Sequence, residues 1–293
     1  EKYPHINFRF VLGDISNRHR IVPLFQKYQF SMVYHAAAYK HVPLIEENPH
    51  EAILVNILGS KNISTLASKY KVNRFVMIST DKAVKPTNVM GASKRAAELF
   101  VQSLQNSEGN ITKFITTRFG NVLGSNGSVI PHFKRQIENG GPITITHPDI
   151  VRYFMTIPEA CELVLHAGIM GKGGEIFVFD MGEPVKILDL ANRMIKLSGF
   201  EPEVDIKIIY TGLRPGEKLY EELLSDDAKT LPTHNEKIMI SKDPTMEFAA
   251  IEKYTNHIIK AALRGEKVEV VQILKNIVPE FKSNNSIYEI LDK

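Results

Sequence analysis

The stretch RFVMISTDKAVKPTNVMGASKRAAELFVQSLQ, from Arg74 to Gln105, joins an expected strand to an expected helix through a polar turn. The strand, Arg74–Thr80, is mostly apolar, which is typical of a strand buried in a parallel sheet. The helix, Asn88–Gln105, places its apolar side chains near one stripe. A strand followed by an amphipathic helix is the repeating unit of a sheet that helices cover on both faces.

The same alternation of strand and helix extends to both sides of this stretch. A long helical pattern precedes it, from Pro49 to Tyr70. We therefore expect an α/β protein with a Rossmann-type, doubly wound parallel sheet. The other apolar runs that are expected to form its strands are Phe8–Asp14, Ser31–Ala38, Phe114–Gly120 and Glu175–Gly182.

The alternation becomes irregular after about Gly124. We expect residues 123–155 and 183–240 to form a smaller α/β lobe that binds the substrate. Residues 1–122 and 156–182 are assigned to the Rossmann-type domain. Residues 241–293 read as a helical C-terminal extension, because they contain two amphipathic patterns.

The glycine-rich loop that normally opens a Rossmann sheet is not found in this sequence. That loop has the pattern GxGxxG and holds the pyrophosphate of a dinucleotide. The segment LGSNGS, Leu123–Ser128, contains glycines, but its spacing and its position are wrong. We expect the chain to start inside the second helix of the fold, in Glu1–Asn7, with the first βαβ unit outside the sequence.

Composition and charge exclude several classes of protein. The 293 residues carry a net charge of +3 without long runs of one sign, which argues against a nucleic-acid partner. The single cysteine, Cys161, permits no intramolecular disulfide and fits a reducing cytosol; we expect it to be buried in a helix. Neither a signal peptide nor an apolar run of membrane-spanning length is present, and no metal site is expected.

Four segments, in this order, resemble the extended short-chain dehydrogenase/reductase superfamily. Within it they are most similar to the UDP-N-acetylglucosamine 4,6-dehydratases of polysaccharide biosynthesis. The resemblance runs from about Phe10 to Glu222 and implies NAD as cofactor, a UDP-N-acetylhexosamine as substrate, and a role in capsule or glycan synthesis. It also implies a bacterial cytoplasmic enzyme, with any membrane anchor outside this chain. The four segments are His35–Pro49, Ser79–Lys94, Arg118–Pro131 and Gly212–Leu224.

The resemblance breaks at one position that bears on the chemistry. Ordinary superfamily members carry a tyrosine four residues before a lysine, where this chain has Met90 before Lys94. The tyrosine takes a proton during hydride transfer and the lysine binds the nicotinamide ribose, but a thioether cannot take a proton. A membrane-anchored branch of the dehydratases shares the methionine, so Met90 marks a subfamily. We hypothesise that Thr80 and Asp81 take over alcohol deprotonation, directly or through water.

The segment Thr80, Asp81 and Lys82 supplies the acid and base that a dehydratase needs. A 4-ketone, formed when carbon 4 gives a hydride to NAD, acidifies the proton on carbon 5. We expect Lys82 to take that proton and Asp81 to protonate the departing hydroxyl of carbon 6. These roles require a raised pKa for Asp81 and a lowered pKa for Lys82.

Cofactor contacts are expected at strand ends, where open α/β sheets bind ligands. Small alanines let a cofactor approach the backbone, although they also suit simple packing, and Asp14 would equally suit a plain turn. His35, inside the same run, is expected to be a core histidine. The resemblance assigns the cofactor contacts to Asp14, Ile15, Ala36, Ala37, Ala38, Asn56 and Lys94.

Substrate contacts are expected from two arginines and from a helix N-terminus. A guanidinium meets phosphate oxygens in pairs, and helix N-termini attract anions. An ion pair at a Pro-Gly turn and a plain helix cap at Ser128 are the alternatives. Lys218, Glu221 and Glu222 read as ordinary helix surface. The resemblance assigns substrate contacts to Lys40, His41, Asn121, Ser128, Val129, Ile130, Thr144, Arg152, Arg214 and Glu217.

Two other functions stay open. A nucleotide-sugar 4-epimerase is disfavoured, because it needs the tyrosine and has no use for the Thr-Asp-Lys segment. A non-catalytic nucleotide-sugar-binding module is compatible with Met90 and the missing glycine loop. The resemblance further implies a homodimer or a higher homo-oligomer, formed through the helices that hold Asn56 and Lys94.

Overall fold

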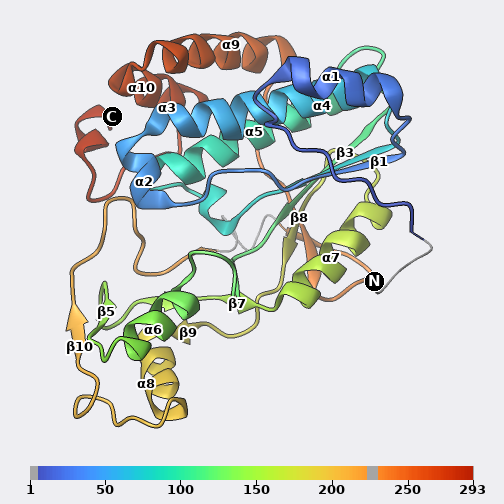
Figure 1. Cartoon of the computed structure of the whole chain (residues 1–293). Coiled ribbons are helices and arrows are strands. Elements are labelled where there is room, and N and C mark those ends of the chain that lie inside the picture. Colours follow the sequence, from blue (N-terminus) through green and yellow to red (C-terminus); the bar gives the residue numbers. More distant parts are fainter. Residues whose placement is uncertain (1–5, 223–229, 293) are drawn as a thin grey trace.

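The largest sheet of the protein has six strands and lies in the middle of the main domain (Figure 1). The computed structural model describes residues 6–222 and 230–292. The strand order is β1-β2-β3-β8-β12-β11, and the first four strands run parallel. The predicted Rossmann-type parallel sheet is therefore confirmed. Its strands are β1 Met32–His35, β2 Arg74–Ile78, β3 Lys113–Arg118, β8 Ile176–Phe179, β12 Ile238–Ser241 and β11 Thr230–Pro232.

Helices cover both faces of this sheet, as the apolar strands require. Most of the helices gather on one face, and α7, Ile157–Met170, lies against the other (Figure 1). Thr156 caps α7, because its hydroxyl accepts a hydrogen bond from Glu159 N. The helices of the more crowded face are α1 Arg18–Lys27, α2 Val42–Glu47, α3 Pro49–Ala52, α4 Ser60–Lys69, α5 Val89–Gln105, α9 Phe248–Arg264 and α10 Lys267–Ile277.

The helix that was predicted from Pro49 to Tyr70 contains a wider turn in its middle. A π-helical segment, η1 Ile53–Gly59, joins α3 to α4. Such segments often occur at functional sites, because the wider turn re-aims one side chain. Asn56 is a buried polar residue in this turn, and it was one of the expected cofactor residues.

The smaller lobe has a hydrophobic core of its own. Phe133 and Ile137 of α6 pack with Ile143 of β5 and with Ile195 of α8. Two short strand pairs, β4 with β7 and β6 with β9, lie where the lobe joins the main domain. The elements of the lobe and the junction are β4 Asn121–Val122, α6 Val129–Glu138, β5 Ile143–Ile145, β6 Val151–Arg152, β7 Phe154–Met155, β9 Val185–Lys186, α8 Ile187–Leu197 and β10 Ile208–Tyr210.

Residues 230–241 belong to the large sheet and not to the lobe. Strand β12 pairs antiparallel with β8, and β11 pairs antiparallel with β12. The expected lobe boundary at residue 240 is therefore misplaced. These two strands were not predicted, because strands of only three and four residues carry a weak local pattern.

The segment Phe8–Asp14 does not form the predicted strand. Phe8 and Phe10 are each 79% exposed, and Leu12 is 78% exposed. A strand needs a neighbour that pairs with its N–H and C=O groups, and none of the described residues forms a strand beside this segment. The prediction that the chain starts inside a helix concerns Glu1–Asn7, most of which lies outside the described residues.

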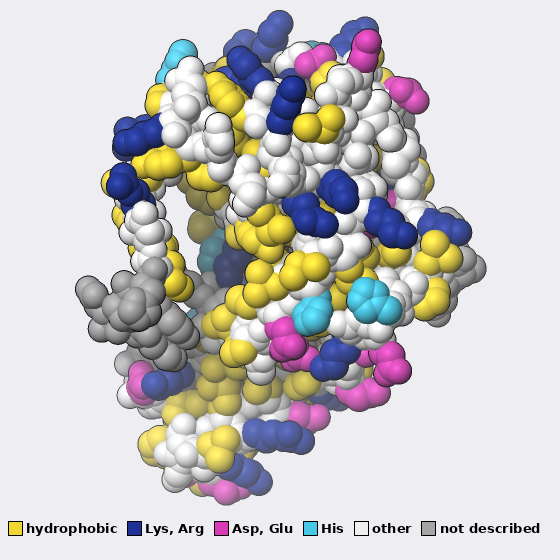
Figure 2. All heavy atoms as spheres, turned by 90° about the vertical axis from the view of Figure 1, so that its right-hand side faces the viewer, with side chains coloured by type: hydrophobic (Ala, Val, Ile, Leu, Met, Phe, Trp, Pro, Cys, Tyr) yellow, Lys and Arg dark blue, Asp and Glu magenta, His cyan; other side chains and the backbone are white. Residues whose placement is uncertain are grey.

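The prediction of a buried Cys161 is wrong, because this residue is exposed on α7. Ile157, Leu165 and Ile169 of the same helix are also 51–67% exposed. Figure 2 shows the face of the molecule that carries α7, with a band of hydrophobic side chains across its middle. Among the described residues, no helix combines the length and hydropathy needed to cross a membrane.

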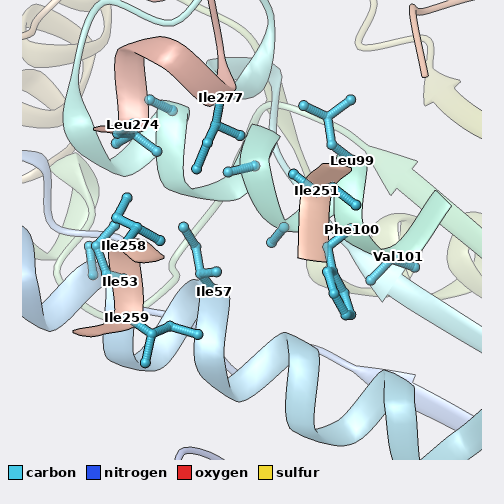
Figure 3. Close-up of a cluster of buried hydrophobic side chains, with 14 of the residues drawn as sticks. Ile53, Ile57, Leu99, Phe100, Val101, Ile251, Ile258, Ile259, Leu274 and Ile277 are labelled. Carbon is cyan, nitrogen blue, oxygen red and sulfur yellow. The ribbon is translucent and has the colours of Figure 1, made fainter. Parts of the chain in front are cut away.

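The C-terminal extension is part of the main hydrophobic core. Ile258 of α9 and Ile277 of α10 are fully buried, and they lie near Ile53 and Ile57 of η1 (Figure 3). Full burial of one such side chain contributes about 1.5–3 kcal/mol. The extension covers the helices that hold Asn56 and Lys94, so that face is not open to a partner. The expected homo-oligomer stays a prediction and would have to use another surface.

Candidate functional site

A cavity of about 860 Å³ lies between the carboxyl edge of the large sheet and the lobe. Loops that follow β1, β2 and β3 form one wall, and α6, β5 and residues 211–217 form the other. Open α/β sheets bind ligands at this edge, and the volume suits a small-molecule site.

Thr80 and Lys82 of the predicted catalytic turn line this cavity, whereas the buried Asp81 lies next to them, outside the lining. Thr80 caps a short 3-10 turn, η2 Asp81–Ala83, and its hydroxyl donates to Asp81 Oδ1 over 2.8 Å. Lys82 Nζ donates to the same oxygen over 3.1 Å. The second carboxylate oxygen, Asp81 Oδ2, is buried without a hydrogen-bond partner. A buried oxygen of this kind is well placed to hold a proton or to meet a ligand.

Burial raises the pKa of Asp81, whose side chain is only 1% exposed. The charge of Lys82 opposes this effect, and the charge of Glu221 adds to it. The raised pKa of Asp81 agrees with the expectation that this side chain acts as an acid.

The pKa of Lys82 is raised, and the expectation of a lowered pKa is wrong. Burial disfavours its ammonium, but the carboxylates of Asp81 and Glu221 outweigh burial. Lys82 Nζ lies 3.1 Å from Asp81 Oδ1 and 3.3 Å from Glu221 Oε1. The lysine is thus held as a cation between two carboxylates.

Glu221 is the residue of this site that the sequence analysis missed. Residues 213–222 form no helix, so the prediction of ordinary helix surface is wrong, and Glu221 is 8% exposed. Burial opposes its ionisation, but Lys82 and Arg152 outweigh burial and lower the pKa of Glu221. Arg152 Nε lies 3.6 Å from its Oε1. No local pattern distinguishes Glu221 from its neighbour Glu222; only the path of the loop does.

Helix α5 brings Met90 and Lys94 to the cavity wall beside the catalytic turn. Lys94 Nζ donates to Ile78 O over 2.8 Å, and burial lowers the pKa of Lys94 to about 8 although Glu98 opposes this. Gly91 allows the helix to come this close. A Cβ atom at Gly91 would lie 2.0 Å from the carbonyl oxygen of Lys82.

Asn56 supports the site through hydrogen bonds to two of its elements. Its amide accepts a hydrogen bond from Tyr39 N over 2.8 Å and donates to Tyr39 O and Ser93 Oγ, each over 3.0 Å. It thereby ties the loop after β1 to α5. His35 is a core histidine as expected, with Nε2 lying 2.8 Å from Ser60 Oγ and burial lowering its pKa to about 3.

The expected cofactor residues divide into two groups. Ala36, Ala38 and Lys94 line the cavity, whereas Ala37 does not. Asp14 and Ile15 also lie away from it: Asp14 is exposed, and its Oδ1 accepts hydrogen bonds from Ser16. Asp14 thus makes a local turn contact, and its expected contact with the cofactor stays a prediction.

The two predicted arginines meet at Glu217 on the opposite wall. Arg152 Nη2 and Arg214 Nη2 lie 3.4 Å and 3.2 Å from Glu217 Oε1. Arg152 also donates to the carbonyl oxygens of Val151 and Lys218, whereas the Arg214 side chain is 58% exposed. Arg214 is thus the freer of the two cations.

The remaining expected substrate residues also lie mostly on this cavity. Ile130 is the exception, because the chain turns it away into α6. Ser128 precedes α6 and makes no capping bond, and its Oγ is buried without a hydrogen-bond partner. The expected substrate residues in the lining, besides the arginines and Glu217, are Lys40, His41, Asn121, Ser128, Val129 and Thr144.

Comparison with known proteins places these features in a family. A family described as "Polysaccharide biosynthesis protein" matches residues 1–243. The capsular polysaccharide biosynthesis protein CapD of Staphylococcus aureus is 60% identical over 220 residues, which are 75% of this chain and 36% of that protein. The chain thus spans about a third of that relative's length. A UDP-glucose 4-epimerase of Rickettsia canadensis is 35% identical and is matched over 94% of this chain and 83% of its own.

Solved structures share the fold. Pen from Bacillus thuringiensis has a TM-score of 0.75 and 35% identity, and the match covers 88% of this chain and 83% of that one. The UDP-glucose 4-epimerase of Thermus thermophilus, solved in complex with NAD, has a TM-score of 0.62. At 22% identity over 70% of this chain and 72% of that one, it supports the fold only.

Proposed function

We propose that this chain, which belongs to the polysaccharide biosynthesis protein family, carries the catalytic centre for NAD-dependent 4,6-dehydration of a UDP-N-acetylhexosamine, such as UDP-N-acetylglucosamine. The product would be a 4-keto-6-deoxy sugar nucleotide. The observation that carries the proposal is the buried contact of Asp81 with Thr80 and Lys82 beside the cavity.

The residues of this site fit the nicotinamide end of NAD. Lys94 Nζ lies at the cavity wall next to Ile78 O, and Ala36 and Ala38 leave room for a flat ring and its ribose. The residues fit the pyrophosphate end less well, because the sequence has no GxGxxG pattern. When bound, NAD would supply the oxidation of carbon 4 and the later reduction of carbon 6.

The hydroxyl proton of carbon 4 can reach Asp81 without a tyrosine. Thr80 Oγ1 already donates to Asp81 Oδ1 over 2.8 Å. Thr80 would take the sugar proton while it passes its own proton to Asp81, which explains why Met90 is tolerated. The raised pKa of Asp81 favours keeping that proton until the elimination.

The elimination then uses Asp81 as acid and Lys82 as base. Lys82 is held as a cation, so it must first become neutral. The preceding protonation of Asp81 removes one of the two carboxylate charges that raise the pKa of Lys82, and Glu221 Oε1 lies 3.3 Å from Nζ to receive the proton. The neutral amine takes the proton of carbon 5, the bond from carbon 6 to oxygen breaks, and Asp81 protonates the departing hydroxyl. One water molecule leaves, and at this stage Asp81 is a carboxylate, Lys82 is an ammonium and Glu221 is protonated. When carbon 6 is reduced, Lys82 would return a proton to carbon 5 and take back the proton held by Glu221, which restores the starting protonation states.

The test is product analysis with the natural full-length protein, NAD and UDP-N-acetylglucosamine. Mass spectrometry and NMR should detect a sugar nucleotide that has lost one water and gained a 4-ketone. Asp81→Asn and Thr80→Val should each abolish or strongly reduce it. Full activity in both variants would overturn the assigned roles.

A nucleotide-sugar 4-epimerase is the second candidate. It is favoured by the match to the Rickettsia canadensis protein over most of this chain. The same assay separates the two, because an epimer keeps the mass of the substrate. Tight binding of the substrate without any product would instead identify a nucleotide-sugar-binding module.

A further inference from the structure

A short segment of the C-terminal extension crosses the outside of the candidate site. It comprises residues 282–286, between α10 and the 3-10 helix η4, Ile287–Leu291, and we call it the strap. It lies beyond residue 243, where the family match ends. The strap contacts two loops that reach the cavity lining where its two walls meet.

The first of these loops is Pro86–Asn88, which joins the catalytic turn to α5. Lys282 N donates to Pro86 O over 3.1 Å, and Asn284 N donates to Thr87 O over 3.2 Å. This loop begins three residues after η2, which contains Asp81 and Lys82. Its position therefore constrains the acid and base.

The second loop is Leu213–Glu217, which carries the Arg214 and Glu217 pair. Gly216 N donates to Asn284 O over 2.7 Å, and the Asn284 side-chain amide donates to Glu217 O over 3.1 Å. The side-chain amide of Asn285 donates to Leu213 O over 2.6 Å. Asn284 thus bonds to both loops at once.

The two loops also contact each other directly and are closely packed. Thr87 Oγ1 and Asn88 Nδ2 both donate to Gly216 O, over 3.0 Å and 2.9 Å. Gly216 has a φ of +76°, and a Cβ atom there would lie 2.4 Å from Asn88 Cβ. There is no room to shift one loop without moving the other.

Both ends of the strap are fixed to buried groups. At one end, Ser286 Oγ donates to Glu46 Oε2 over 2.7 Å, while Glu46 Oε1 accepts from Val89 N, the first residue of α5. At the other end, Ser283 N donates to the Asp292 carboxylate, which pairs with Lys275 over 2.6 Å. Contacts at both ends therefore hold the strap in place between the two loops.

We propose that Asn284 and Asn285 are positioning residues that set the distance between the arginine loop and the catalytic turn. A nucleotide held at Arg214 and Glu217 would then present its sugar to Asp81 and Lys82. This inference deepens the proposed function and rests on it for the identity of the ligand. The strap's effect on the loops can be measured without any ligand.

The experiment uses Asn284→Ala and Asn285→Gly in the natural full-length protein. The first variant removes the bond to Glu217 O. The second removes the bond to Leu213 O and keeps the left-handed backbone that Asn285 adopts at a φ of +51°. Asn276→Ala, at an exposed position on α10, is the matched control.

Each strap variant should bind uridine diphosphate about fivefold more weakly by calorimetry, the equivalent of one lost hydrogen bond, while the control is unchanged. Amide hydrogen exchange should become faster at residues 87–88, 213–214 and 216–217 and stay the same at α6 and α8. Unchanged exchange at both loops in both variants would overturn the inference, whatever the enzyme does.

The two proposals fail in different ways. If the wild-type protein does not bind uridine diphosphate, the proposed function fails, and hydrogen exchange alone decides the role of the strap. If the wild type binds and both variants bind equally well, the positioning role is wrong. A loss of thermal stability without a change in affinity would also count against it.

Discussion

Single side chains decide the charge state of the site. Lys82 is a cation because Asp81 and Glu221 lie on either side of it, although its burial alone would favour the neutral amine. A base that starts protonated needs an acceptor nearby. Glu221 is the described carboxylate that contacts Lys82 from another part of the chain, so it should control the pH dependence of turnover.

Glu221→Gln should lower kcat by tenfold or more near pH 7, because Lys82 loses its proton acceptor. The variant also removes one of the two carboxylates that raise the pKa of Lys82, so that pKa should fall. The activity of the variant should therefore recover as pH rises, when Lys82 loses its proton to solvent. The measurement is kcat between pH 6 and pH 10.

Glu222→Gln is the control for this prediction. Glu222 is 42% exposed, pairs with the exposed Lys85 and the largely buried Lys218, and does not contact Lys82, so its removal should leave the pH profile unchanged. A Glu221→Gln enzyme with wild-type kcat at every pH would remove Glu221 from the mechanism.

At the scale of elements, helix α5 must lie directly against the catalytic turn. Gly91→Ala would normally favour a helix by about 1 kcal/mol. Here the new Cβ atom would meet the Lys82 carbonyl oxygen at 2.0 Å, so the turn or the helix must move. We expect a loss of stability in urea unfolding and a large loss of kcat.

Gly168→Ala on α7 provides the comparison, because its Cβ atom would lie 3.1 Å from both Tyr34 Oη and Val76 Cγ2, a close contact without the overlap expected at Gly91. The neighbours need to move by only a few tenths of an ångström, so the loss of stability should be smaller than for Gly91→Ala, and kcat should change little. Equal behaviour of the two variants would show that close packing at Gly91 is not required.

A buried ion network ties α5 and β3 to the start of the extension. Arg118 Nη2 lies 2.5 Å from both Glu98 Oε2 and Asp243 Oδ2. Burial opposes ionisation of Glu98, but Arg118 outweighs it and the pKa of Glu98 is lowered. The stabilisation is therefore present above the unfolded pKa of this carboxyl and is lost as pH falls through its folded pKa.

Glu98→Gln should lower the free energy of unfolding by ~3–5 kcal/mol, because it leaves a buried guanidinium without its main partner. The variant should also lose less stability than the wild type on acidification. The measurement is urea unfolding at pH 7 and at pH 4. Glu280→Gln is the control: this partner of Arg95 is 40% exposed, and its loss should cost at most ~1 kcal/mol.

At the scale of the whole molecule, the C-terminal extension and the main domain share one core. Ile258→Ala should lower the free energy of unfolding by ~2–5 kcal/mol, because this side chain is fully buried against η1 and α5. Leu263→Ala on the same helix should change it by less than ~0.5 kcal/mol, because Leu263 is 68% exposed. Urea unfolding followed by circular dichroism measures both, and similar losses would contradict the shared core.

Local sequence patterns were enough to predict the parallel sheet, to place Thr80, Asp81 and Lys82 after a strand, and to put Met90 and Lys94 on one face of the next helix. These predictions rest on strand–helix alternation, helical spacing, and the meeting of parallel strand ends at one edge of a sheet. Arg152, Arg214 and Glu217 were instead assigned by the resemblance of two separate segments to a known family, and all three line the cavity.

The groups that face one another across the cavity could not be paired without the fold. Glu221 reaches Lys82 because a loop without regular structure folds back, and no local pattern predicts that path. The same reason explains why the sequence did not predict the contacts of the strap. It also explains why Cys161 is exposed and why Phe8–Asp14 does not form a strand. Strand pairing, ion pairing and burial depend on partners far away in the sequence, and only the fold brings those partners together.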